Sequence, residues 1–180
     1  MDSNYKKKIL EEQKFYYRNR FSYIKAKLSN SEKYVLSRYI YHLRCKRYYE
    51  DQSDFISRLL WFWHTRRFNH YSYKTGLQIP SHCVDWGLMI YHFGWIVVNG
   101  GVKLGRNVSI YPGVTIGQTA GNPKNVPIIG DNVFIYQNAM VCGKIRVGNN
   151  ATILANSVVT HDVPDNSIVG GIPARVIRIK

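Results

Sequence analysis

One aliphatic residue recurs at every sixth position between residues 129 and 159. The members of this series are Ile129, Ile135, Val141, Val147, Ile153 and Val159. A helix face recurs every three to four residues and a half-buried strand alternates every two, so neither element explains this period. A period of six fits a coil of short strands, three to a turn, in which each strand directs one aliphatic side chain inward. Stacked coils would bury these side chains as one continuous ladder.

The repeat extends toward the N-terminus with two interruptions. Further aliphatic residues keep the six-residue step, namely Ile79 (weakly), Ile90, Ile96, Leu104, Ile110 and Ile116. The step from Ile96 to Leu104 has two extra residues, and the step from Ile116 to Ile129 has seven, which predict a loop around residues 118–127. The fold class that we predict is mainly β, a parallel β-helix over residues 75–180 that includes a C-terminal tail.

Residues 1–74 differ in character from the repeats. The first 75 residues hold 17 Lys and Arg against seven Asp and Glu, which gives +10 of the whole chain's +14. Helical patterns cover residues 5–28, then residues 32–49 after an Asn30-Ser31 cap, and then residues 54–68. The third helix has an apolar stripe, made of Ile56, Leu59, Leu60 and Trp63. We therefore expect a basic, aromatic-rich helical subdomain over residues 1–74.

This subdomain has two interpretations that remain open. It covers the open first coil of the β-helix, or it also brings its basic, aromatic surface to an anionic membrane or an anionic acceptor. No motif that reads nucleic acid accompanies the positive charge, so nucleic acid is not an expected partner.

The N-terminal residues, the longest apolar cluster and the cysteines indicate the cellular location of the protein. The first residues, MDSNYKKKILEEQK, contain no apolar run of a signal peptide, and the cluster LLWFW is too short to cross a membrane. Three scattered cysteines without metal-ligand spacing indicate reduced thiols. We expect a cytoplasmic protein without a metal.

His92 is the candidate for chemistry among six histidines, because only this one lies within the well-phased coils, in IYHFGWIVVNGG. A lone histidine is more often structural than catalytic, so position alone does not decide its role. A metal enzyme on such coils would need three converging histidines, and the sequence offers one.

Residues 75–180 resemble the serine acetyltransferase branch of the left-handed β-helix acyltransferases. Three stretches carry the resemblance: YHFGWIVVNGG, VTIGQT before the loop, and VGGIPARV near the C-terminus. The resemblance implies a left-handed β-helix, a homotrimer, and transfer of acetyl from acetyl-CoA to a hydroxyl group.

The resemblance also implies roles for individual residues. His92 matches the general base, which takes a proton from the acceptor hydroxyl as it attacks the thioester. Acetyl-CoA would lie along the coil edges and bind residues of three regions. These are Gly117, Gln118 and Thr119 at the strand end, Gln137 and Ala155 at equivalent corners, and Arg175 and Lys180 for the phosphates.

Three positions depart from the serine acetyltransferase pattern. Gln78 stands where a carboxylate supports the histidine, Val126 stands where a loop histidine holds serine, and Tyr91 stands where an Asp precedes the histidine. A site that lacks these polar partners should bind serine poorly. The remaining pattern is similar to the subgroup of capsule and exopolysaccharide O-acetyltransferases, whose acceptors are sugars.

The sequence therefore predicts an acetyl-CoA-dependent O-acetyltransferase that modifies a sugar, a polysaccharide or a lipid-linked glycan. Gln78, Tyr91 and Trp95 are its expected acceptor-binding residues, since exposed aromatic rings suit sugar faces. Two alternatives remain: a serine O-acetyltransferase of cysteine biosynthesis, and a non-catalytic β-helix scaffold.

Overall fold

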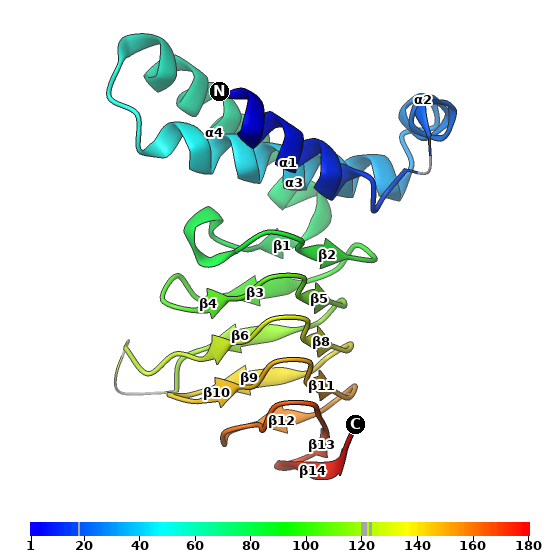
Figure 1. Cartoon of the computed structure of the whole chain (residues 1–180), viewed down its shortest axis with the longest axis vertical. Helices are drawn as coiled ribbons and strands as arrows, with labels where there is room; N and C mark the ends of the chain where they lie inside the picture. The colour runs from blue at the N-terminus through cyan, green and yellow to red at the C-terminus, as the bar shows by residue number, and fades with distance from the viewer. Residues whose placement is uncertain (18, 120–121, 123) are drawn as a thin grey trace. The chain divides into compact units, whose positions relative to one another are not determined.

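The chain divides into a helical unit and a unit of short strands (Figure 1). The computed structural model describes residues 1–17, 19–119, 122 and 124–180. The two compact units are Met1–Leu77 and Gln78–Lys180. None of the described helices combines the length and the apolar character that crossing a membrane requires.

Four helices form the described part of the first unit: α1 (Ser3–Gln13), α2 (Arg20–Leu28), α3 (Glu32–Glu50) and α4 (Phe55–Thr75). Polar side chains fix where they begin, because each accepts a hydrogen bond from an otherwise unsatisfied backbone N–H of the first turn. The capping residues are Asp2, Asn19, Ser31 and Asp54. The cap at Asn19 divides the predicted helix over residues 5–28 into α1 and α2. Gly76, with φ of 79°, ends α4 seven residues later than predicted.

Helix α3 is the centre of the helical core. Its buried face includes Val35, Tyr39, Ile40 and Leu43, the face that the three-to-four spacing predicts. The ring of Tyr39 lies 5.0 Å from that of Phe68 on α4. Helix α1 is attached to α3 by a buried ion pair between Glu12 and Arg44, and Tyr5 donates to the Arg44 carbonyl.

The predicted apolar stripe of α4 is not its buried face. The buried residues of α4 are His64, Phe68, Tyr71 and Thr75. Ile56, Leu59 and Trp63 of the stripe are exposed. The physical reason is that α3 packs its apolar face mainly against the part of α4 from His64 onward, where Tyr39 contacts Phe68 and His42 contacts Tyr71.

A buried pair of histidines joins α3 and α4. His42 Nδ1 lies 3.0 Å from His64 Nδ1, and Arg38 Nη2 lies 3.0 Å from His42 Nε2. The ring of Tyr71 stacks on His42 at 5.6 Å. Burial, helped by the positive charge of Arg38, lowers the pKa of His42 to about 2 and that of His64 to about 4. Both rings are therefore neutral in the folded unit at neutral pH.

This pair predicts that the helical unit loses stability in mild acid. Both pKa values lie below the ordinary value of 6.5, so the unfolded chain binds more protons once the pH falls through 6.5. Stability is then highest above pH 6.5 and decreases toward pH 4. Urea unfolding followed across this range should show the decrease, and the double variant His42→Leu with His64→Leu should flatten it. An equal slope in the variant would show that other groups cause the acid sensitivity.

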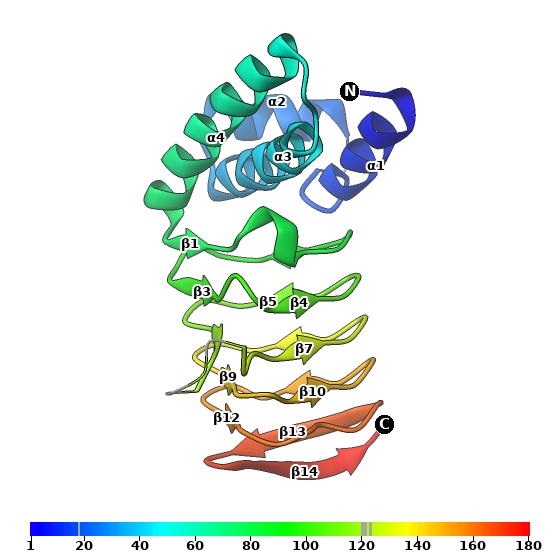
Figure 2. The ribbon, with the colours of Figure 1, turned by 90° about the vertical axis from the view of Figure 1, so that its left-hand side faces the viewer.

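The second unit is a parallel β-helix whose strands form three sheets (Figures 1 and 2). Sheet A contains β1 (Leu77–Gln78), β3 (Ile96–Val98), β6 (Thr115–Gly117), β9 (Met140–Cys142) and β12 (Val158–Val159). Sheet B contains β4 (Lys103–Leu104), β7 (Ile128–Ile129) and β10 (Arg146–Val147). Sheet C contains β2 (Met89–Ile90), β5 (Ser109–Ile110), β8 (Phe134–Ile135), β11 (Thr152–Ile153), β13 (Ser167–Gly171) and β14 (Ala174–Ile179). A short 3-10 helix covers Ser81–Cys83.

The aliphatic residues of the six-residue repeat form the core of this unit. Ile110, Ile135 and Ile153 stack in successive strands of sheet C, and each is fully buried. Equivalent ladders run through Ile116, Val141 and Val159 in sheet A and through Leu104, Ile129 and Val147 in sheet B. The parallel coils and the N-terminal helices confirm the predicted fold class.

The two extra residues of the upper coil lie elsewhere than the repeat predicted. Val98, and not Ile96, pairs with Ile116 in sheet A. The step from Val98 to Leu104 is therefore a regular six, and the insertion lies between Ile90 and Val98. Ile96 is also buried, because the backbone N–H of Val97 donates to Val114 and so aligns Ile96 with that corner residue. A run of three aliphatic residues, Ile-Val-Val, made both phases compatible with the sequence.

Three corners connect the sheets in every coil. Corner 1 leads from sheet C to sheet A, corner 2 from sheet A to sheet B, and corner 3 from sheet B to sheet C. At corner 3, an asparagine amide of each coil donates to the asparagine of the next, at 2.8 to 3.1 Å. The members of this asparagine column are Asn107, Asn132, Asn150 and Asn166, all in the left-handed backbone region.

Candidate active site

His92 lies on corner 1, between β2 and β3, in the coil that carries the two extra residues. The insertion enlarges this corner, and His92, Phe93 and Trp95 are exposed there. Gly94 has φ of 147°, and a Cβ at this position would stand 2.7 Å from Pro112 Cβ in the next coil. The Trp95 carbonyl accepts a 2.7 Å hydrogen bond from Gly113 N. His92 is therefore presented to solvent from a corner that is anchored on the coil below it.

A stack of tyrosine rings stands directly beside His92. Tyr91 stacks on Tyr111 at 4.6 Å, and Tyr111 stacks on Tyr136 at 4.9 Å. Sequence reasoning singled out Tyr91 and missed the other two. The signal was present, because each tyrosine directly follows a ladder isoleucine: Ile90, Ile110 and Ile135. Since its face is covered by Tyr111, Tyr91 offers mainly its edge and hydroxyl to a ligand.

Gln137 and Ala155 lie on corner 1 in lower coils. The backbone N–H of Asn138 donates to Pro112, and that of Asn156 donates to Gln137, so the corners are in register. This column includes the corner of His92 at its upper end. The equivalence of the two corners agrees with the repeat, whereas contact with CoA stays a prediction.

Gly117, Gln118 and Thr119 lie at corner 2, the opposite edge of sheet A from His92. The Gly117 carbonyl accepts from Gly143 N at 3.2 Å, and Gln118 and Thr119 are exposed. The loop continues to Pro127 and includes residues 120, 121 and 123, which lie outside the described residues. Within one chain, the structure does not bring these residues to the corner of His92.

Val126 and His82 both meet the turn at Gly100 and Gly101 of corner 2. A Cβ at Gly101 would lie 3.1 Å from Val126 Cγ2, and His82 Nε2 lies 2.9 Å from the Gly100 carbonyl oxygen. Gln78 is exposed on β1, the neighbour of β3 in sheet A.

The two cations that were predicted to bind the phosphates, Arg175 and Lys180, lie apart. Lys180 Nζ donates to the Asn150 carbonyl at 2.6 Å, and its backbone N–H donates to Asn166, so Lys180 lies at corner 3. Arg175 pairs with Gly170 at the other end of β14 and is exposed. The structure therefore separates Lys180 from Gln137 and Ala155. The phosphate-binding roles of both cations stay predictions. Among the described residues, no three His, Cys, Asp or Glu side chains gather as metal ligands would.

Similarity to known proteins identifies the family of the chain. A model of the bacterial transferase hexapeptide, six repeats long, matches residues 127–161. A serine acetyltransferase of Neisseria gonorrhoeae, solved in complex with serine, is 30% identical and aligns with a TM-score of 0.70. The alignment covers 98% of this chain and 70% of that one.

The chain belongs to the hexapeptide-repeat transferases. Among curated relatives of this hexapeptide-repeat transferase, a Staphylococcus aureus serine acetyltransferase is 42% identical over 106 residues, which are 58% of this chain and 50% of the relative. The chain thus spans about half the length of the curated relatives it matches. A Brucella abortus serine acetyltransferase solved with coenzyme A is 27% identical with a TM-score of 0.64, covering 83% of this chain and 56% of that one.

These relatives correct the predicted acceptor. The sequence predicted a sugar, polysaccharide or glycan acceptor in surface polysaccharide biosynthesis, and that prediction is wrong. The similar proteins are serine acetyltransferases, both by sequence and by structure. The stated alternative agrees better with them. The error came from treating three absent side chains, at Gln78, Tyr91 and Val126, as stronger evidence than the shared framework of the whole chain.

Proposed function

We propose that this hexapeptide-repeat transferase is an acetyl-CoA-dependent serine O-acetyltransferase with His92 as its general base. The observation that carries the proposal is the 30% identity over 98% of the chain to a transferase that was solved with serine bound. The exposed position of His92, at an enlarged corner, supports the assignment because a base must reach an external substrate.

The proposed reaction needs one proton carrier and one acyl donor. The imidazole of His92 takes the proton of the serine hydroxyl while the hydroxyl oxygen attacks the thioester carbonyl carbon of acetyl-CoA. The new C–O bond forms, the C–S bond breaks, and the proton passes from the imidazole to the departing CoA sulfur. Backbone N–H groups around Gly117 are the proposed donors to the carbonyl oxygen as it becomes negatively charged.

Two edges of sheet A carry the proposed substrate contacts. His92 and the column of Gln137 and Ala155 occupy corner 1, and Gly117 to Thr119 occupy corner 2. Because one chain keeps these edges apart, we infer that corner 1 of one subunit faces corner 2 of another in a homotrimer. Ile128 and Met140, which are exposed on the sheet faces, are apolar surface that such an assembly would cover. Sedimentation velocity should return the mass of three chains, and the mass of one chain would contradict this arrangement.

Compared with other members of the family, this chain is expected to bind serine weakly. Val126 offers no hydrogen-bond donor, and Gln78 and Tyr91 offer neutral groups where charged partners would hold a zwitterion. We therefore expect a high KM for serine. Restoring polarity with Val126→His should lower that KM and leave kcat less changed.

Release of the CoA thiol from acetyl-CoA tests the function directly. L-serine should accelerate the release, and D-serine and L-alanine should not. Mass spectrometry of the product should show one acetyl group on the serine oxygen. Thiol release that ignores serine would contradict the proposal.

Gly94 tests whether the corner of His92 must keep its shape. We expect Gly94→Ala to lower kcat by about 100-fold, because a methyl group at φ of 147° and 2.7 Å from Pro112 forces the corner to shift. Gly100→Ala is the matched control at corner 2, where the added Cβ would meet, among the described residues, only His82 Nε2 at 3.8 Å. Equal kinetics for both variants would show that the geometry at Gly94 is dispensable.

A further inference from the structure

The first half of α4 carries an unusual amount of exposed apolar surface. Five large side chains within nine residues are 49% to 74% exposed, namely Phe55, Ile56, Leu59, Phe62 and Trp63. We name these five residues the α4 apolar surface. No residue of α4 before His64 is buried, although the ring of Trp63 lies 5.3 Å from that of the buried His42.

The charge within α4 has one sign, and the carboxylate next to its first turn is that of the N-cap, Asp54. Helix α4 contains four cations and no acidic residue, and the helical unit carries +10. Arg58 and Arg66 are both exposed, and helical spacing puts them on the same side as Leu59 and Phe62. An apolar face bordered by arginines, with Asp54 at its N-terminal end only, complements a surface that is apolar inside and anionic outside.

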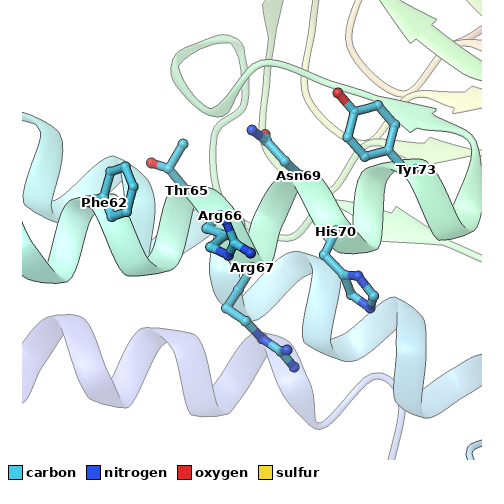
Figure 3. A pocket seen from close by; sticks show the side chains of 7 residues that line it. All are labelled: Phe62, Thr65, Arg66, Arg67, Asn69, His70 and Tyr73. Atoms are coloured by element: carbon cyan, nitrogen blue, oxygen red, sulfur yellow. The ribbon is translucent and has the colours of Figure 1, made fainter.

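The same side of α4 continues as a shallow hollow toward the C-terminal end of the helix. The hollow has a volume of about 600 Å³, and its lining residues are Phe62, Thr65, Arg66, Arg67, Asn69, His70 and Tyr73. Figure 3 shows Phe62, Thr65, Asn69 and Tyr73 along one side of α4, while Arg67 and His70 point to the other side. Tyr73, at the C-terminal end of this side, is 89% exposed, and Phe62 lies at its other end.

We propose that the α4 apolar surface binds the headgroup region of an anionic lipid bilayer. Phe and Leu side chains enter the boundary between headgroups and acyl chains, Trp63 suits the headgroup level, and Arg58 and Arg66 pair with lipid phosphates. A second copy of the chain in a twofold-symmetric contact fits this surface less well, because it would bring the arginines of the two α4 helices together. The proposal is independent of the acetyl transfer.

Co-sedimentation with lipid vesicles tests the proposal on the full chain. At low salt, the protein should bind vesicles of phosphatidylglycerol mixed with phosphatidylcholine, and molar salt should release most of it. Leu59→Ser with Phe62→Ser should weaken binding by about tenfold or more, and so should Arg58→Gln with Arg66→Gln. The matched controls are Leu10→Ser with Ile172→Ser, which removes two exposed apolar side chains elsewhere, and Lys103→Gln with Lys144→Gln.

Three outcomes would overturn the proposal. One is that the wild type stays in the supernatant with anionic vesicles at low salt. Another is that the α4 variants bind as the wild type does, or that the controls lose as much binding. The third is self-association without lipid that disappears in Leu59→Ser with Phe62→Ser, which would make the surface a contact between chains. Unchanged thermal unfolding and serine-dependent CoA release in the α4 variants will show that they are folded.

Discussion

His92→Ala is expected to lower serine-dependent release of CoA by about 10²- to 10⁴-fold. The reason is that the serine hydroxyl is a weak nucleophile until a base takes its proton, and no other histidine lies at corner 1 among the described residues. The loss should appear in kcat, since the imidazole acts in the transition state. Stopped-flow or steady-state detection of the free thiol measures it.

Two control variants separate catalysis from folding. His82→Ala and His161→Ala each remove an exposed imidazole at corner 2, and neither should approach the loss seen for His92→Ala. Thermal unfolding of His92→Ala will show whether this variant is folded. Full turnover in His92→Ala would refute the assignment of the base, while serine-dependent turnover itself would still support the acetyltransferase.

Glu12→Ala is expected to destabilise the helical unit by about 3–5 kcal/mol. Glu12 and Arg44 form a bidentate pair, with Arg44 Nε and Nη2 donating at 2.8 and 2.7 Å, and both side chains are almost fully buried. Removal of the carboxylate leaves the guanidinium of α3 in an apolar interior. Urea unfolding monitored by far-ultraviolet circular dichroism gives the difference in free energy.

The matched control for this pair lies on the surface of α3, the helix that carries Arg44. Glu50 meets Arg47 at 3.4 Å in a solvent-exposed pair, and Glu50→Ala should cost at most about 1 kcal/mol. If Glu12→Ala costs no more than Glu50→Ala, α1 does not depend on its ion pair for attachment to α3.

The β-helix could be predicted because its core residues recur at one position of the six-residue repeat. Ile129, Ile135 and Val141 fall every sixth residue, and each is buried in the ladder. Such a core needs no knowledge of distant contacts, because each coil meets the next at the same position. The helical unit has no such regularity. The His42–His64 pair joins residues 22 positions apart, and the local sequence around each histidine does not predict that the two would pair.

The interruptions of the repeat were harder to interpret than the repeat itself. The loop after Ile116 was placed correctly, since Asn122 stands where the six-residue step would put the next aliphatic residue. The insertion beside His92 was misplaced because Ile96 and Val98 both suit an inward position. The candidate base was therefore identified, but the widened corner that presents it was not.

The β13–β14 hairpin closes the stack at its C-terminal end and has a consequence for how the molecule opens. Strand β14 runs antiparallel to β13, and most of its side chains are exposed, whereas each interior coil is covered on both sides. Solenoid stability is a sum of nearest-neighbour terms, so the last coil has one neighbour fewer. Amide hydrogens should then exchange with deuterium in a gradient, first in β14 and β13 and last in the coils around β6 and β9. We therefore expect the β-helix to unfold from its C-terminal end, one coil at a time.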